Sequence, residues 1–271
     1  MRLGRSRRSN NVIDARGRSG GRGRTAAIGC GPLLVAGILA LLFGVDPGQV
    51  LQGLGGGSGA AVEQTAPDAP ADQTRAYVEA VLGDTEDVWE DVYPAFEGRP
   101  YQEPELVLFT GGVQTACGTG QSQMGPFYCP RDQRVYVDPS FFNTLARMGG
   151  RGDFAPAYVI AHEVGHHIQN LTGVLGATQR ARGRSDVSVA VELQADCLAG
   201  VWAHHADRDR DVLDESDVQE GIQAARSVGD DAIRGGPVPY HQLSHGTSQQ
   251  RAEWFVRGLR SGRMDACDTF G

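Results

Sequence analysis

The chain has 271 residues, 40% of them hydrophobic, which suffices for one sizeable folded domain with appendages and excludes wholesale disorder. Its 38 glycines follow no G-X-Y period, so a collagen-like fibre is also excluded. The net charge of −8 is uneven, because residues 1–24 hold eight arginines and one acid, which leaves −15 for the remainder. So acidic a body lacks the basic surface that phosphate contacts require, and we expect no nucleic-acid partner.

The basic stretch, residues 1–24, is followed by an uncharged stretch, residues 25–45. As a helix those 21 residues would extend about 32 Å, enough to cross a bilayer core of about 30 Å. A cleaved signal peptide is the alternative, but the basic region is long and no A-x-A cleavage site closely follows Phe43. We therefore expect an uncleaved single-pass transmembrane anchor behind a basic cytoplasmic tail, with the following chain in the periplasm or at the cell surface.

Residues 46–72 are rich in Gly, Ala, Pro, Gln and Asp, which is typical of a flexible linker, so the folded domain is expected in residues 73–271. Helical spacing of apolar residues predicts a first helix at Arg75–Tyr93, and strand-like runs follow at Glu105–Gln114 and Arg134–Asp138. Further helices are expected at Phe141–Met148, Pro156–Leu171, Val187–His205, Ser216–Val228 and Ser248–Arg260. This order predicts an α+β fold with a small antiparallel sheet and mostly helices.

Four cysteines of the expected domain allow three disulfide pairings. Cys117 and Cys129 lie close in sequence and flank a glycine-rich turn, so we predict one disulfide between them and a second between Cys197 and Cys267. Zinc coordination by the four is the alternative, although no C-x-x-C pair supports it. Paired cysteines agree with export from the cytoplasm.

The helix expected at Pro156–Leu171 carries the sequence HEVGH at residues 162–166. Histidines four residues apart share one helix face, so His162 and His166 can bind one metal ion, and Glu163 can take a proton from a metal-bound water. This pattern arises by chance in about one unrelated chain in a hundred, but here the helix is apolar and a glutamate without a metal would be unfavourable. The adjacent His167 is rotated off the ligand face, which favours a structural role.

A third metal ligand must come from elsewhere. The metzincin pattern fails, because Gln169 and Thr172 occupy its glycine and final histidine positions. Glu192, on the helix expected at residues 187–205, is the predicted third ligand, and Asp196 one turn later can hydrogen-bond a ligand histidine. A rival set of ligands lies near the end of the same helix, at His204, His205 and Asp207.

Hydrolysis of a carbonyl compound also needs a donor for the oxyanion that forms. The segment at residues 240–251 holds four candidates, namely Tyr240, His241, His245 and Arg251. Composition does not choose among them.

Several separated motifs resemble one family. They are RRSNNVIDAR at 7–16, the apolar anchor, GPFYCPRD at 125–132, GDFAPAYVIAHEVGHHIQN at 152–170, ELQADCLAG at 192–200, SHGTSQQR at 244–251 and CDTFG at 267–271. In this order, nearly end to end, they resemble the bacterial putative neutral zinc metallopeptidase family. The resemblance implies a zincin-like domain of the gluzincin type behind a single anchor, with zinc bound by His162, His166 and Glu192 and with Glu163 as the general base.

The SHGTSQQR stretch also resembles the His-x-x-x-x-x-Arg element of gluzincin-type membrane endopeptidases, in which the histidine and arginine stabilise the transition state. This likeness favours His245 and Arg251, although Gly246 stands where those enzymes usually have proline. We therefore expect a membrane-anchored zinc endopeptidase with a peptide or protein substrate. A zinc amidohydrolase acting on cell-wall peptides, or a non-catalytic zinc-stabilised binding domain, are the alternatives.

Overall fold

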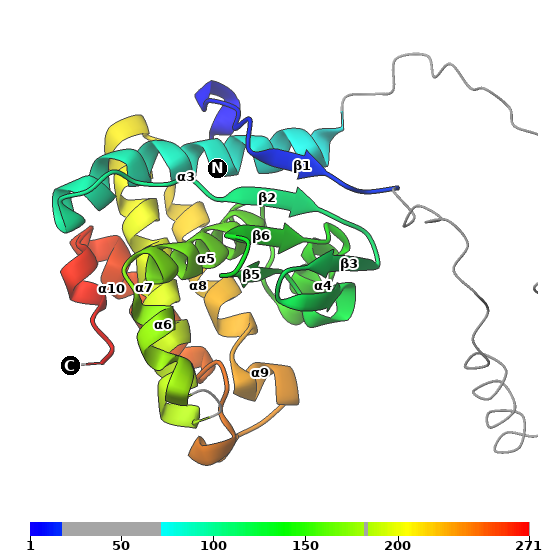
Figure 1. Ribbon diagram of the computed structural model, residues 1–271, viewed down its shortest axis with the longest axis vertical. Coiled ribbons are helices and arrows are strands. Elements are labelled where there is room, and N and C mark those ends of the chain that lie inside the picture. The colour runs from blue at the N-terminus through cyan, green and yellow to red at the C-terminus, as the bar shows by residue number, and fades with distance from the viewer. Residues whose placement is uncertain (18–71, 182–183, 271) are drawn as a thin grey trace, which may run out of the picture. The chain divides into compact units, whose positions relative to one another are not determined.

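The computed structural model of the protein describes residues 1–17, 72–181 and 184–270 (Figure 1). The first of these segments and the chain from Ala71 onward form one compact unit, a mixed α/β fold that is mostly helical with a small sheet. The predicted anchor, the rest of the predicted tail and all but the last residue of the predicted linker lie outside the described residues. None of the described helices is both long and apolar enough to span a membrane.

Four strands form one mixed sheet. In spatial order they are β1 (Val12–Asp14), β2 (Glu105–Leu108), β6 (Arg134–Val137) and β5 (Phe127–Cys129). β1 is parallel to β2 and β2 is parallel to β6, whereas β5 is antiparallel to β6. The prediction of an antiparallel sheet is therefore wrong for this sheet. The chain makes a long excursion between β2 and β6 and enters β6 in the direction of β2, as parallel pairs require.

The strand predicted at Glu105–Gln114 is divided in two. β2 ends at Leu108, and Gly111 then adopts a positive φ of 77°, a conformation that glycine takes without steric cost. The chain turns there into a separate antiparallel hairpin of β3 (Gly112–Thr115) and β4 (Gly118–Gln121).

All the predicted helices form, most of them with longer limits. They are α3 (Gln73–Glu97), α4 (Ser140–Met148), α5 (Phe154–Leu171), α7 (Ser185–Arg210), α8 (Glu215–Ser227) and α10 (Ser248–Ser261). α8 and α10 begin at reciprocal capping boxes, in which the side chains of Asp214 and Thr247 accept backbone hydrogen bonds of the first turn. Two short helices, α6 (Val174–Thr178) and α9 (Asp230–Arg234), were not predicted, because five residues are too few to show a helical period.

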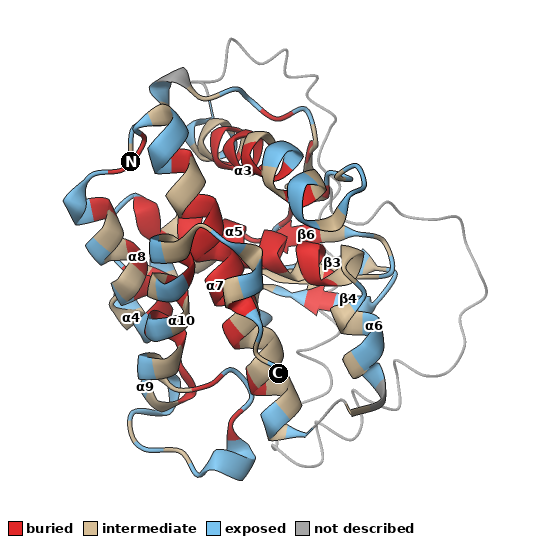
Figure 2. Ribbon diagram, turned by 90° about the vertical axis from the view of Figure 1, so that its left-hand side faces the viewer, coloured by how far each residue is buried: buried red, intermediate tan, exposed pale blue. Residues whose placement is uncertain are grey.

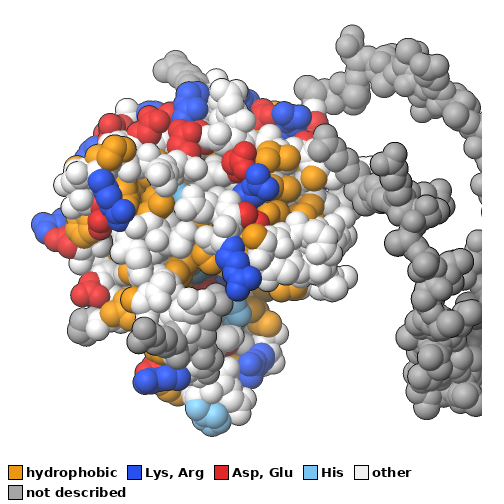
Figure 3. Space-filling view, viewed as in Figure 1, with side chains coloured by type: hydrophobic (Ala, Val, Ile, Leu, Met, Phe, Trp, Pro, Cys, Tyr) orange, Lys and Arg blue, Asp and Glu red, His pale blue; other side chains and the backbone are white. Residues whose placement is uncertain are grey.

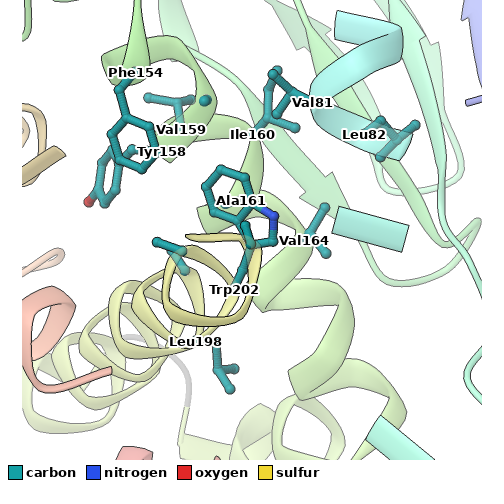
Figure 4. Packing of buried hydrophobic residues seen from close by; sticks show 14 of the residues in the cluster. Val81, Leu82, Phe154, Tyr158, Val159, Ile160, Ala161, Val164, Leu198 and Trp202 are labelled. Carbon is teal, nitrogen blue, oxygen red and sulfur yellow. The ribbon is translucent and has the colours of Figure 1, made fainter. Parts of the chain in front are cut away.

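α5 lies at the centre of the core and packs against α3, α7, α8 and the sheet. Figure 2 shows buried residues concentrated in α5, α7 and β6. On one side of α5, Phe154 stacks on Trp202 of α7 with ring centroids 5.7 Å apart (Figure 4). Leu198 of α7 and Val81 of α3 belong to the same cluster. The HEVGH sequence is therefore carried on a helix that is buried over most of its length.

The first seventeen residues, here called the N-terminal arm, belong to the domain. Val12 to Asp14 form β1 at one edge of the sheet, and the side chains of Ser9 and Val12 are buried. The folded unit therefore includes much of the segment that the sequence assigned to a separate tail.

Both predicted disulfides are present. Cys117–Cys129 joins the β3–β4 turn to β5, and Cys197–Cys267 joins α7 to the short C-terminal helix at Met264–Cys267. Because all four sulfurs are bonded in pairs, they are not zinc ligands, and the alternative of a four-cysteine zinc site is excluded.

Candidate metal centre and active site

Three side chains from α5 and α7 converge at one point. His162, His166 and Glu192 each direct a ligand atom into a group whose members lie within 4.8 Å of one another. His162 Nε2 lies 3.3 Å from Glu192 Oε2, and His166 Nε2 lies 3.6 Å from Glu192 Oε1. The three residues that the sequence proposed as zinc ligands are thus brought together.

The opposite nitrogen of each histidine has its own acceptor. His162 Nδ1 donates to Asp196 Oδ1 at 2.8 Å, and His166 Nδ1 donates to Gln169 Oε1 at 2.8 Å. Each hydrogen bond fixes the tautomer that leaves Nε2 free to bind a cation. The side-chain amide of Gln169 is itself held, because it donates to the carbonyl of Val191 at 2.7 Å.

Arg251 is buried beneath this group. Its guanidinium donates to both oxygens of Asp196, at 2.8 Å and 2.9 Å, and to the carbonyl of Val228 at 3.1 Å. The hydroxyl of Tyr158 donates to Asp196 Oδ1 at 2.5 Å. Arg251 therefore fixes the carboxylate that orients His162, which makes it a positioning residue in this structure.

Glycines set the distances between the three helices that build the site. A Cβ on Gly165, inside the HEVGH sequence, would lie 2.8 Å from the carbonyl oxygen of Ala195, so α5 and α7 are in backbone contact. A Cβ on Gly258 of α10 would lie 1.9 Å from the carbonyl oxygen of Cys197 on α7. Only glycine permits such close approach. These contacts bring Glu192 within reach of α5 and Arg251 within reach of α7.

A cleft of about 450 Å³ opens over the metal-binding group. Its polar lining comes from the three ligand candidates together with Glu163, His245 and Arg251. The remaining wall is largely apolar and includes Met148, Val159 and the residues Phe127 and Tyr128 of β5. The cleft thus combines the metal-ligand candidates and other titratable groups with an apolar surface beside an edge strand.

Glu163 is almost fully buried at the base of this cleft. Burial raises the pKa of its carboxyl, an effect that the neighbouring His166 and His162 oppose. Within the described residues, no group donates a hydrogen bond to this carboxylate. It is therefore available to a water molecule in the cleft.

His245 stands on the loop before α10 and lines the same cleft. Buried Asp230 organises this loop: one of its oxygens accepts the backbone N–H groups of Ser244 at 2.7 Å and of His245 at 2.8 Å. The other oxygen lies 3.2 Å from His245 Nδ1 and accepts its proton, which leaves Nε2 for the cleft. Among the four oxyanion-donor candidates, Tyr240 and His241 are exposed and do not line the cleft.

The rival ligands His204, His205 and Asp207 do not form one of the possible metal-binding groups of the described residues. His204 Nδ1 bonds the carbonyl of Leu259 and His205 Nε2 bonds that of Gly262, so both rings anchor the end of α10. The carboxylate of Asp207 accepts the backbone N–H of Leu213, in the loop that follows α7.

The sequence profile of the family described as putative neutral zinc metallopeptidase matches residues 1–270. The chain belongs to this family. It is similar to the uncharacterized protein YpfJ of Escherichia coli (strain K12), with 41% identity over 292 aligned positions that cover 100% of this chain and 99% of that protein. It is also similar to the uncharacterized proteins Mb2605 of Mycobacterium bovis and Rv2575 of Mycobacterium tuberculosis, each 40% identical over 258 positions that cover 85% of both chains. No solved structure matches.

Membership of this family implies Zn²⁺ as the cofactor and a peptide or protein as the substrate. The residues present fit this ion in number and type, with two imidazole nitrogens and one carboxylate. They also fit it in charge. The carboxylates of Glu163 and Asp196 are buried and that of Glu192 is partly buried. The three face one guanidinium, that of Arg251, so a dication restores neutrality. Burial lowers the pKa of His162, but the carboxylate of Asp196 outweighs this effect and raises that pKa to about 9, which shows that the pocket favours positive charge.

Sequence reasoning missed two residues of the site. Gln169 was noted only because it breaks the metzincin pattern, although it lies three residues after His166 on the same helix face. Asp230 carried no signal, because it lies fifteen residues before His245 on a short helix that was not predicted.

Proposed function

We propose that the protein is a zinc-dependent endopeptidase with a zincin-like catalytic domain. The observation that carries this proposal is the unpartnered, buried carboxylate of Glu163 beside the convergent His162, His166 and Glu192. A purely structural zinc site gains nothing from an additional buried carboxylate next to its ligands, and a hydrolase requires one.

In this proposal Glu163 is the general base. When bound, zinc supplies a Lewis acid that polarises water and the scissile carbonyl. Glu163 accepts the proton of the attacking water and delivers it to the leaving amine, and its raised pKa makes it the stronger base for the first of these steps. In its doubly protonated form His245 donates from Nε2 to the developing oxyanion, while its Nδ1–H donates to Asp230, which fixes the orientation of the ring. Arg251 holds Asp196, the carboxylate that orients His162.

The substrate is proposed to bind as an extended peptide. β5 is an outer strand of the sheet, and its residues Phe127 and Tyr128 line the cleft. An edge strand offers unpaired backbone groups with which a peptide segment can form a further strand. This geometry supports cleavage within a chain, and it favours an endopeptidase over a cell-wall amidohydrolase or a non-catalytic binding domain.

Membrane association through residues 25–45 and a location of the domain outside the cytoplasm are further parts of the proposal. The first is supported by the absence of charged residues from this stretch. The second is supported by the two disulfides, which persist in oxidising compartments.

The test compares the wild type with Glu163→Gln and with the matched surface variant Glu253→Gln. Each protein is incubated with a diverse peptide library, and new N-termini are identified, with bound zinc measured in parallel. We expect Glu163→Gln to lose at least about 100-fold in cleavage rate while retaining zinc, and Glu253→Gln to cleave at the wild-type rate.

Cleavage by Glu163→Gln at the wild-type rate would refute the role of general base. A wild-type protein that binds zinc and cleaves no peptide would refute the endopeptidase, and incubation with crosslinked cell-wall peptides would then test the amidohydrolase.

A further inference from the structure

The N-terminal arm is part of the sheet. Val12 and Asp14 pair with Leu106 and Leu108 of β2 in parallel register. The backbone N–H of Leu106 donates to the carbonyl of Asn11 at 2.8 Å, and the N–H of Ala15 donates to the carbonyl of Leu108 at 2.8 Å. The arm therefore covers an edge of the sheet that would otherwise expose unpaired backbone groups.

A buried carboxylate of the domain depends on the arm for its partners. Glu86 of α3 has a fully buried side chain. Its oxygens accept hydrogen bonds from Ser9 Oγ at 2.6 Å, from Asn11 Nδ2 at 2.8 Å and from Arg7 Nη2 at 2.8 Å. All three donors belong to the RRSNNVIDAR motif, and no residue of this motif lines the cleft. A buried carboxylate without such donors is strongly destabilising, so the arm and α3 fit each other specifically.

The backbone of the arm also fits a groove on α3. A Cβ on Gly83 would lie 2.5 Å from the carbonyl oxygen of Arg7, and the N–H of Ser9 donates to the carbonyl of Glu79 at 2.9 Å. Glycine inside a helix is unfavourable by itself, and here its missing side chain makes room for the arm.

The arginines of the arm have partners in the domain. Arg7 pairs with Glu86 and Asp87 of α3, and Arg2 pairs with Asp211 after α7. Figure 3 shows acidic and basic side chains intermingled on this part of the surface, where the arm lies over α3. The arginines of the arm are thus explained by their ion pairs with the domain. Their presence is therefore weaker evidence that the arm stays in the cytoplasm.

We infer that the N-terminal arm and the domain lie on the same side of the membrane, so that the intervening chain crosses it an even number of times or not at all. Hydrogen bonds join atoms about 3 Å apart, whereas the hydrocarbon core of a bilayer is about 30 Å thick. A single crossing by residues 25–45 would separate β1 from β2 and Arg7 from Glu86. From the sequence we expected a single-pass anchor with a cytoplasmic tail, and this inference replaces that topology. It does not depend on peptidase activity.

The test uses two single-cysteine probes in the whole chain, with Cys30→Ser removing the cysteine that lies outside the two disulfides of the described residues. Asn10→Cys reports on the arm and Gln219→Cys on α8, and both positions are exposed. Cells with an intact cytoplasmic membrane are treated with a membrane-impermeant maleimide, and labelling is compared with that of permeabilised cells. A cytoplasmic thiol protein serves as the control for membrane integrity.

We expect both probes to react to the same extent in intact cells. Protection of both probes until permeabilisation would equally support a shared side, with that side being the cytoplasm. Labelling of Gln219→Cys in intact cells while Asn10→Cys reacts only after permeabilisation, or the reverse, would overturn the inference.

A second measurement tests whether the arm occupies its groove. Alanine replaces glycine in two helices of the purified full-length protein. Gly176→Ala in α6 meets open space and is expected to raise the melting temperature or leave it unchanged, because alanine favours helix. Gly83→Ala is expected to lower the melting temperature, because the new methyl group collides with the arm. A rise with Gly83→Ala would show that the groove is empty and would remove the basis of the inference.

Discussion

The buried ring of His167 should make the free energy of unfolding depend on pH. Its ring is fully buried next to the ligand candidate His166. Nε2 donates to the carbonyl of Gln102 at 2.6 Å, so Nδ1 is the acceptor for the hydroxyl of Tyr128 at 2.9 Å. The side-chain amide of Asn170 donates to the same hydroxyl at 3.0 Å. The neutral ring therefore ties the zinc helix to the edge strand of the cleft, and a second proton would break this network.

The size of this change in stability follows from the difference between the pKa of His167 in the folded state and its pKa in the unfolded state. Burial lowers the pKa of His167 to about 4, whereas an unfolded histidine titrates near about 6.5. Because the folded value is the lower one, the stabilisation is complete above the unfolded pKa and is lost as pH falls through the window between the two values. Between about pH 7 and about pH 4.5 the free energy of unfolding should decrease by about 2 kcal/mol through this residue alone.

The assay is denaturant unfolding of the wild type and His167→Gln at both pH values, with a chelator present so that metal release does not contribute. Glutamine does not titrate, so the stability difference between the two proteins should shrink by about 2 kcal/mol at the lower pH. His241→Gln, at an exposed position, should show no such change. An equal difference between the wild type and His167→Gln at both pH values would refute the assignment of a buried neutral ring.

Three further predictions concern other parts of the domain. Asp230→Asn should reduce peptide cleavage by roughly tenfold or more at unchanged zinc content, since the carboxylate orients His245 without touching the metal ligands; loss of zinc from this variant would contradict that separation. Replacement of both Cys197 and Cys267 by serine opens a loop of 70 residues and should lower the free energy of unfolding by about 4 kcal/mol, measured by denaturation of the variant and the wild type. Gly200→Ala places a Cβ 2.1 Å from a backbone oxygen of α10 and should destabilise the protein by about 1–3 kcal/mol in the same assay, and a neutral effect would show that the α7–α10 contact is looser than described.

The sequence predicted the helices of the site because their signals are local. The spacing of His162 and His166 defines one helix face, and the search for a third ligand on a later helix led to Glu192. The disulfides followed from the short separation between Cys117 and Cys129. Neighbouring positions in the chain thus specified the histidine pair and the first disulfide, and the second disulfide joins the two cysteines of the domain that remained.

Features that depend on distant segments were not predicted. The parallel pairing of β1 with β2 joins residues nearly a hundred positions apart, and no periodicity in either strand specifies its partner. The arginines of the arm suggested membrane topology, and their carboxylate partners became visible only once the chain was folded. The same holds for the close backbone contacts at Gly83, Gly165 and Gly258. A glycine inside a helical pattern indicates close approach of another segment but does not identify that segment.

The arrangement separates metal binding from turnover. The ligand candidates and Asp196 lie on α5 and α7, whose spacing is fixed by backbone contact at Gly165, and Arg251 of α10 closes the group from below. His245 stands outside this packed unit, on a loop whose conformation is set by Asp230. Substitutions in the packed helices should therefore change metal affinity and stability together. Substitutions in the loop should change the reaction rate alone, because no ligand is held by it.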